Sequence, residues 1–184
     1  ISKSNKNSIK LPDIEKISNR INFEEIRAEA DSKSLIFRFS NTKILKKYEP
    51  EGSISKKLYN ISEKIRCENI GTSYFKGVKN NIEKLYNKRV LGLDLKKSED
   101  KITESFENYL RVKFLDFKNE NSIDKKFKPF KKNLNDKFKD KISELKEAML
   151  DQDKFNSIIS NLISNMSFDE NLDEERKKDD ENNE

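Results

Sequence analysis

Apolar residues recur at helical spacing along most of this chain, most clearly in its middle third. After a stop signal at Pro50-Glu51-Gly52, two successive runs of apolar residues follow with steps of three and four: Ile54, Leu58, Ile61 and Ile65, then Phe75, Val78, Ile82 and Leu85. Such steps place one apolar stripe on each helix. The pattern predicts two helices, about 53–70 and 73–90, joined by a short turn into a helical hairpin. A single kinked helix is the competing interpretation.

The turn of this hairpin is expected at Gly71. Glycine suits the left-handed position just after a helix end, and Thr72 or Ser73 can cap the helix that follows. Gly71 is one of only four glycines in the chain. We therefore expect Gly71 to have a positive φ angle.

The second half of the chain predicts three further helices. The first begins near Ser98, the second has Pro129 near its start, where the missing N–H is tolerated best, and Asp151 caps the third. Their stripes are, in order, Ile102, Phe106, Tyr109, Leu110, Phe114 and Leu115; Phe130, Leu134, Phe138, Ile142, Leu145 and Met149; and Phe155, Ile158, Ile159, Leu162, Ile163 and Met166.

The N-terminal part has a weaker pattern. Residues 1–21 are polar and are expected to be an extended entry, and Asn22 can cap a short helix over 23–30. Alternation of apolar and other residues over 34–39 predicts a short strand. Ser40-Asn41-Thr42 then opens a second short helix that ends before Pro50.

These elements predict an all-α fold, a helical bundle of about five main helices around the central hairpin. The N-terminal segment is irregular. Residues 1–168 form one helical domain in this prediction. Residues 169–184 hold nine acidic and three basic residues with almost no apolar ones, which predicts a disordered acidic linker.

Composition narrows the possible chemistry. The chain has 184 residues, no histidine and one cysteine, Cys67, which excludes imidazole-assisted catalysis and an internal disulfide. We expect no catalytic residue, no metal site and no cofactor in this chain. The mean hydropathy of −0.99 and the lack of a long apolar run predict a protein without a membrane span. The single cysteine fits the reducing cytoplasm, which is the expected location. The net charge of +5 comes mostly from lysine with few aromatic residues between, which does not favour nucleic-acid binding.

One polar constellation stands out, formed by Glu63, Arg66 and Glu68. Glu63 and Arg66 are three residues apart and can pair along one helix face. Glu68 lies about 140° further round the helix than Glu63, toward a neighbouring segment or a partner. The constellation is either an exposed pair worth a few tenths of a kcal/mol, or a polar lock that orients the hairpin and holds a surface for a partner.

An ordered set of short motifs runs through the same region. It reads Pro-x-Gly, then Glu-x-x-Arg-x-Glu-x-Ile-Gly, then Gly-Val-x-x-Asn. The motif residues, which we take as the candidate interaction residues, are Pro50, Gly52, Glu63, Arg66, Glu68, Ile70, Gly71, Gly77 and Asn81.

This set resembles the signature of the CobT subunit of the aerobic, ATP-dependent cobaltochelatase. The segments Phe127–Phe130 and Asp151–Phe155, and the acidic C-terminal segment, are similar to later parts of that family. The sequence departs from the pattern at Lys64 and Ile65, where the family has glutamine and alanine. The family's von Willebrand A-type domain, with its metal site, is not in these residues.

The resemblance implies a subunit of a complex that inserts cobalt into hydrogenobyrinic acid a,c-diamide during cobalamin biosynthesis, hence a ligase that forms metal–nitrogen bonds. In such a complex the partners are a CobS-like AAA+ ATPase of the MoxR type and a large, CobN-like chelatase subunit. ATP, Mg²⁺ and cobalt are used by the complex, and this chain would be an oligomeric docking, chaperone-like element. The alternative is a helical adaptor for a MoxR-like AAA+ ATPase that is unconnected with cobalt.

Overall fold

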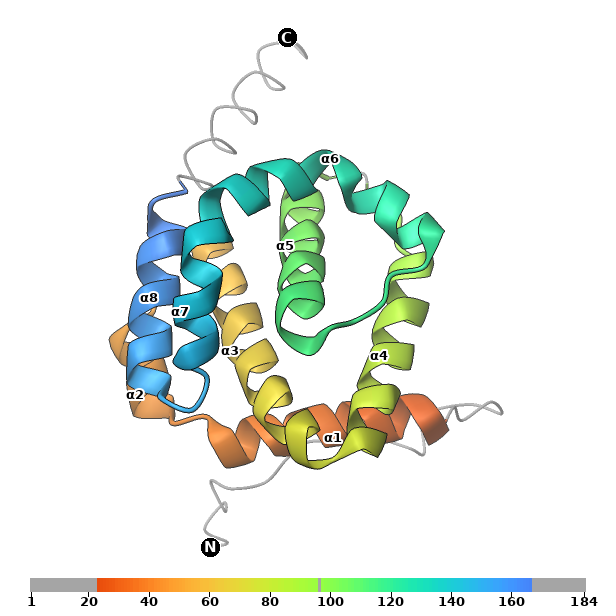
Figure 1. Cartoon of the computed structure of the whole chain (residues 1–184), viewed down its shortest axis with the longest axis horizontal. Coiled ribbons are helices and arrows are strands. Elements are labelled where there is room, and N and C mark those ends of the chain that lie inside the picture. Colours follow the sequence, from red (N-terminus) through yellow and green to blue (C-terminus); the bar gives the residue numbers. More distant parts are fainter. Residues whose placement is uncertain (1–22, 96, 167–184) are drawn as a thin grey trace, which may run out of the picture.

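The computed structural model describes residues 23–95 and 97–166, which form helices joined by short connections (Figure 1). The expected extended entry, the Asn22 cap and the acidic linker lie outside these residues. The all-α prediction is confirmed. The elements are α1 (Phe23–Phe39), α2 (Thr42–Lys47), α3 (Ser53–Tyr74), α4 (Lys76–Leu91), α5 (Ser98–Leu115), α6 (Asn121–Phe138), the 3₁₀ turn η2 (Lys139–Lys141), α7 (Ile142–Glu147) and α8 (Gln152–Ser164).

Helix α3 is the central element of the fold. It packs against α1, α4, α5 and α8, and 13 of its 22 residues are buried. These include polar residues on several sides, among them Ser62, Glu63, Arg66 and Glu68. The single apolar stripe predicted for α3 accounts for only part of its buried surface. Other helices surround α3 on several sides, so it buries polar side chains as well as apolar ones. Each buried polar side chain needs a partner inside the protein.

The connection between α3 and α4 lies four residues later than predicted. The two helices are separate, with Phe75 in a non-helical conformation between them. The prediction of a left-handed turn at Gly71 is wrong, because Gly71 lies inside α3, and among the described residues the glycine with positive φ is Gly52 (88°). The hydroxyls of Thr72 and Ser73 donate back to carbonyls within α3 and do not cap α4.

Gly71 is needed for a different reason, the close approach of α1. A Cβ atom at this position would lie 2.1 Å from Cδ2 of Leu35, which is itself 7% exposed. Glycine thus lets α1 lie directly against α3.

The predicted strand at 34–39 is also wrong, since these residues form the last turns of α1. The buried residues of α1 are Ala28, Ser32 and Leu35, spaced by four and three, whereas Phe37 is 56% exposed. The alternation in the sequence therefore does not mark a strand, because these residues lie on a helix of which one face is buried. The short helix after Asn41 is confirmed, and the Asn41 side chain accepts a hydrogen bond from the Lys43 N–H.

The C-terminal half differs from the prediction mainly at Pro129. This residue lies in the interior of α6 and not near a helix start. Lys125 and Pro129 are both exposed, so the Lys125 carbonyl, which loses its helical partner, can bond to water. The stripe predicted as one helix is divided between α6 and α7, which η2 separates, and its last residue, Met149, follows the end of α7. The helix from Ser98 to Leu115 and the Asp151 cap of α8, which accepts from the Lys154 N–H, are confirmed.

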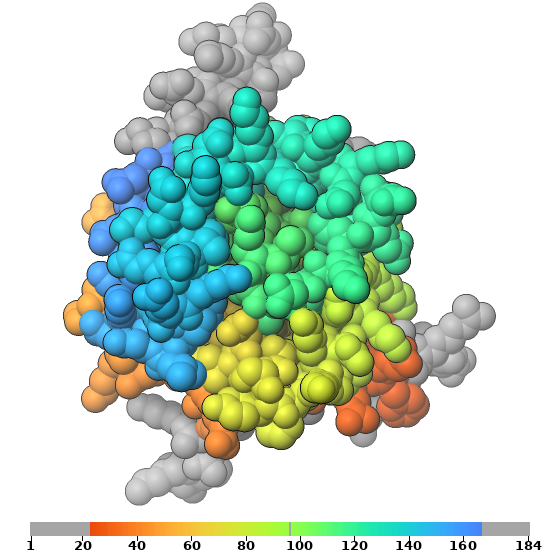
Figure 2. All heavy atoms as spheres, viewed as in Figure 1, coloured from red at the N-terminus to blue at the C-terminus, as the bar shows by residue number. Residues whose placement is uncertain are grey.

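In the view of Figure 1, α6 runs across the top of the molecule and α7 and α8 lie at its left. Figure 2 shows that side chains fill much of the space between the ribbons in this view. The buried core runs through all the long helices, and its members include Leu58, Phe106, Leu110, Phe138 and Phe155. Within the described part of the chain, every helix is too short or too polar to cross a bilayer.

Candidate functional site

The candidate site begins with Arg66 and Glu63 on α3. The guanidinium donates from Nε to Glu63 Oε2 (2.8 Å) and from Nη2 to Oε1 (2.9 Å). The Arg66 and Glu63 side chains are only 1% and 3% exposed. The pair expected from the three-residue spacing is thus present, and its burial removes the interpretation of an exposed surface pair.

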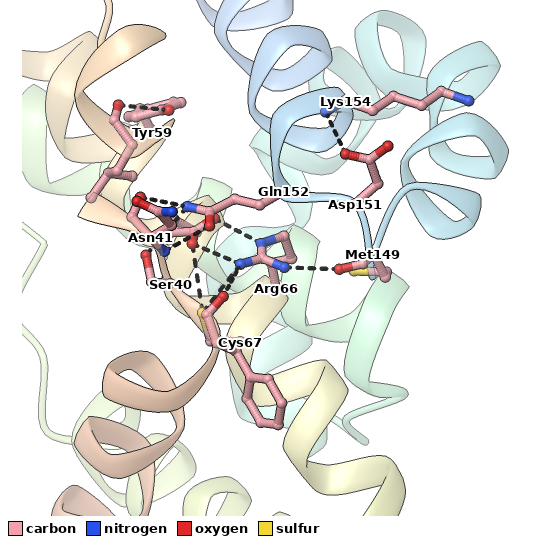
Figure 3. A network of polar contacts seen from close by, with 12 residues as sticks. Ser40, Asn41, Tyr59, Arg66, Cys67, Met149, Asp151, Gln152 and Lys154 are labelled. Carbon is pink, nitrogen blue, oxygen red and sulfur yellow. Dashed lines mark hydrogen bonds and ion pairs between the residues drawn. The ribbon is translucent and has the colours of Figure 1, made fainter. Parts of the chain in front are cut away.

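Arg66 also connects α3 to two distant parts of the chain (Figure 3). Nη1 donates to the Met149 carbonyl (2.9 Å), in the connection between α7 and α8, and Nη2 donates to the Phe39 carbonyl (2.6 Å) at the end of α1. Burial alone would lower the pKa of Arg66, but the hydrogen bond and charge of Glu63 outweigh it and raise the pKa above its usual value. Arg66 is therefore a permanent cation that joins three segments.

Cys67 lies beside this pair. Its Sγ is 3.7 Å from Arg66 Nη2 and from Glu63 Oε1, and the residue is fully buried. Burial and the neighbouring Glu63 carboxylate raise the pKa of the thiol well above its usual range. A neutral, inaccessible thiol is a poor nucleophile, so Cys67 serves packing.

Glu68 points away from this pair, toward α1 and α5. Its Oε1 accepts from Ser32 Oγ (2.5 Å) and its Oε2 from Arg111 Nη1 (2.7 Å). Glu68 and Arg111 are 0% and 2% exposed. The carboxylate therefore binds α3 to both neighbouring helices at once.

The ionic network continues from Arg111 along α5 and onto α4. Arg111 donates from Nε to Glu107 Oε1 (2.8 Å), and Arg89 donates to Glu107 Oε2 (2.8 Å) and to Glu104 Oε1 (2.6 Å). Burial alone would raise the pKa of Glu107, but the charges of Arg111, Lys64 and Arg89 hold it below its usual range. The guanidinium of Arg111 also stacks over the Tyr86 ring at 4.8 Å, a cation–π contact with α4.

The other motif residues are spread along α3 and α4. Pro50 is buried, Gly52 caps α3, and Ile70 is 5% exposed. Asn81 donates from Nδ2 to Asp31 Oδ2 (3.1 Å), which adds a contact between α4 and α1. Gly77 is exposed, and a Cβ atom there would touch nothing within 4 Å. Steric crowding therefore does not explain why this position is a glycine.

The sequence prediction missed the two partners of Glu68, namely Ser32 and Arg111. It also missed the continuation of the network through Glu107 and Arg89. A local signal existed only for Glu107 and Arg111, which are four apart on a helix and lie next to apolar stripe positions. The pairing of Glu68 with Arg111 spans 43 residues and has no signature in local spacing.

The segment Asp151–Phe155 also serves the fold. The Asn41 N–H donates to Gln152 Oε1 (2.7 Å), and Gln152 Nε2 donates back to the Asn41 carbonyl (3.2 Å; Figure 3). Phe155 is fully buried in the core. Together with the Asp151 cap, these contacts fix the start of α8 next to α2.

The chemistry of the site is that of paired ions. Each carboxylate of Glu63, Glu68 and Glu107 accepts hydrogen bonds from arginine. In the parts of the chain that the structure describes, no group of three or more histidine, cysteine or acidic residues is arranged to hold a metal ion. The arrangement fastens helices together.

Comparison with known proteins assigns the chain to a family. The family model described as "Cobalamin biosynthesis protein CobT" matches residues 2–184. Neither the search of curated proteins nor the search of solved structures found a match. Since the family model spans nearly the whole chain, including the motif residues of α3 and α4, the chain belongs to the CobT family of cobalamin biosynthesis proteins.

Proposed function

We propose that the chain is a subunit module of an ATP-dependent cobaltochelatase, which inserts cobalt into hydrogenobyrinic acid a,c-diamide in cobalamin biosynthesis. It acts as a docking, chaperone-like element for a CobS-like AAA+ ATPase and a CobN-like large chelatase subunit. The observation that carries the proposal is the match to the CobT family over residues 2–184. ATP, Mg²⁺ and the cobalt substrate are handled by the other subunits.

The internal pairing of the motif residues is consistent with a docking role. Glu63, Arg66 and Glu68 are all 2% exposed or less, so they act on the shape of the module and do not touch a partner directly. By joining α1, α3, α5 and the α7–α8 connection, they give the module one rigid surface. A rigid surface loses little conformational entropy on binding.

We assign the contact with the AAA+ subunit to the junction of α3 and α4. Tyr74 and Phe75 are 69% and 58% exposed, and their ring centroids are 6.5 Å apart. Exposed neighbouring aromatic side chains are unfavourable in water and are enriched at the centres of protein interfaces. The pair lies at the end of the same helix that the ionic network fixes.

The test measures binding of the cognate AAA+ subunit to the immobilised chain in the presence of ATP and Mg²⁺. The wild-type chain should retain the AAA+ subunit, and the double variant Tyr74→Ser/Phe75→Ser should bind at least about tenfold more weakly. Phe23→Ser, which removes a 73% exposed aromatic residue from the start of α1, is the matched control and should bind like wild type. Circular dichroism checks that each variant is folded.

The same experiment separates the two candidate functions. Addition of the large chelatase subunit to the immobilised complex should retain it as well. Retention of the AAA+ subunit without the large subunit would favour the adaptor that is unconnected with cobalt. Failure of the wild-type chain to bind the AAA+ subunit would contradict both.

A further inference from the structure

A cavity of about 800 Å³ lies between α1, α3, α4 and α5, next to the ionic network. Its volume falls in the range of roughly 300–1,000 Å³ that is usual for small-molecule sites. The apolar part of its wall comes from α1 and α4 and includes Ala28, Ile36, Ile82 and Leu85. Polar lining residues come from all four helices, and α1 contributes Glu25, Glu29, Ser32 and Lys33. The cavity therefore combines an apolar patch on α4, formed by Ile82 and Leu85, with charged residues around it, which suits an amphipathic ligand.

The acidic groups deep in the cavity already have partners. Both oxygens of Glu68 accept hydrogen bonds, from Ser32 and Arg111. Both oxygens of Glu107 accept as well, from Arg111 and Arg89. A cationic ligand would have to compete with these guanidinium groups for the carboxylates. The site is thus poorly suited to a cation.

Hydrogen-bond donors, by contrast, remain available in the same cavity. Lys64 lines the cavity and is half-buried. It makes no close hydrogen bond or ion pair with another described residue, although its charge acts on Glu107 at longer range. Arg89 uses Nη1 and Nη2 for one bond each, and its side chain is 40% exposed. Because a guanidinium carries five N–H groups, several of those on Arg89 are open to a ligand.

The ion pairs around the cavity also favour an anion at Lys64. The lining residues include five cationic ones, Lys33, Lys64, Lys88, Arg89 and Arg111, and four acidic ones, Glu25, Glu29, Glu68 and Glu107. Lys33 pairs with Glu29 and Lys88 with Glu25 near the exposed rim. Arg111 and Arg89 pair with Glu68, Glu107 and Glu104. Lys64 is left as the lining cation without a close ion pair in the described part of the chain, and its charge acts on Glu107 at longer range. A half-buried ammonium beside an apolar wall is stabilised by an anion.

We propose that this cavity binds an organic anion with an apolar body, whose acidic group lies at Lys64 and Arg89 and whose body lies against Ile82 and Leu85. This site is independent of docking to the AAA+ subunit. It gives the module a small-molecule ligand in contact with the network that positions α3.

The test uses two fluorescent probes that share an aromatic body and differ in charge: 8-anilinonaphthalene-1-sulfonate and its neutral analogue N-phenyl-1-naphthylamine. The wild-type chain should bind the sulfonate saturably at one site per chain and more tightly than the neutral probe. Lys64→Met should weaken sulfonate binding by about fivefold and leave neutral-probe binding unchanged. Leu85→Trp, which fills the cavity from its apolar wall, should weaken binding of both probes.

Lys56→Met is the matched control. Lys56 lies on the same helix, pairs with Glu49 at the surface and does not line the cavity, so its removal should change neither affinity. Lys64 is only half-buried, so the Lys64→Met variant is expected to fold, which its melting curve will check. Equal sulfonate affinity of Lys64→Met and wild type would overturn the proposal. So would non-saturable fluorescence, or sulfonate binding that Leu85→Trp leaves intact.

Discussion

The substitution Arg66→Met removes the cation that joins three segments while keeping most of the side-chain volume. It leaves the Glu63 carboxylate, at 2% exposure, without a counter-charge. Breaking a buried pair by removing one partner costs about 3–5 kcal/mol. The Phe39 and Met149 carbonyls lose their donors as well, at about 1 kcal/mol each. Because these costs overlap, we expect a loss of about 4 kcal/mol, a large part of the roughly 5–15 kcal/mol that stabilises a typical domain.

Urea unfolding followed by far-ultraviolet circular dichroism measures this loss through the midpoint and slope of the transition. The matched control is Lys141→Met, which breaks a pair of the same three-residue spacing with Glu144 at the surface and should leave the midpoint unchanged. The double variant Glu63→Leu/Arg66→Met should be more stable than Arg66→Met alone, since no unpaired charge is then buried. A loss below about 1 kcal/mol for Arg66→Met would refute the reasoning.

Four further predictions follow from the same structure. Gly71→Ala should destabilise the protein by about 1–3 kcal/mol because its Cβ meets the Leu35 side chain, whereas Gly77→Ala should cause no loss; urea melts compare the two. Asp151→Ala removes the cap of α8 and should cost about 1 kcal/mol in the same assay, and an unchanged midpoint would contradict this. Burial raises the pKa of Tyr109 to about 12, so the folded state keeps a proton that the unfolded phenol loses near pH 10, and stability should fall as pH rises above about 10. Absorbance titration of tyrosinate checks the pKa. The chain, which lacks histidine, should show no stoichiometric Co²⁺ site in calorimetry, and a one-site isotherm would contradict that.

Local periodicity was sufficient to predict most of the helices. The stripes of α5 and α8 and the Asp151 cap could be read directly from the sequence because each depends on residues within a few positions of one another. The Glu63–Arg66 ion pair could be predicted for the same reason, because its two residues are three positions apart on one helix. The all-α fold followed from these local patterns.

The errors occurred where the decisive contact is distant in sequence. Glycine before two hydroxyl residues has the same local signature whether the chain turns there or another helix approaches, and only the contact with Leu35 shows that Gly71 serves the second purpose. The partners of Glu68 come from α1 and α5, so no spacing within α3 could identify them. Residues 34–39 alternate like a strand, but they continue α1, which packs against α3.

The claim that the family motif works by fastening α3 to its neighbours is tested most directly by a double-mutant cycle on Glu68 and Arg111. The variants are Glu68→Leu, Arg111→Met and the combination of both, and the free energy of unfolding of each is measured with urea. Arg111→Met leaves the Glu68 carboxylate buried without a counter-charge. Glu68→Leu leaves Arg111 paired with Glu107, and in the double variant Glu107 keeps its pair with Arg89, so neither buries an unpaired charge. We predict that the double variant is more stable than the sum of the single losses implies, by at least about 1.5 kcal/mol. Losses that add to within about 0.5 kcal/mol would contradict the claim.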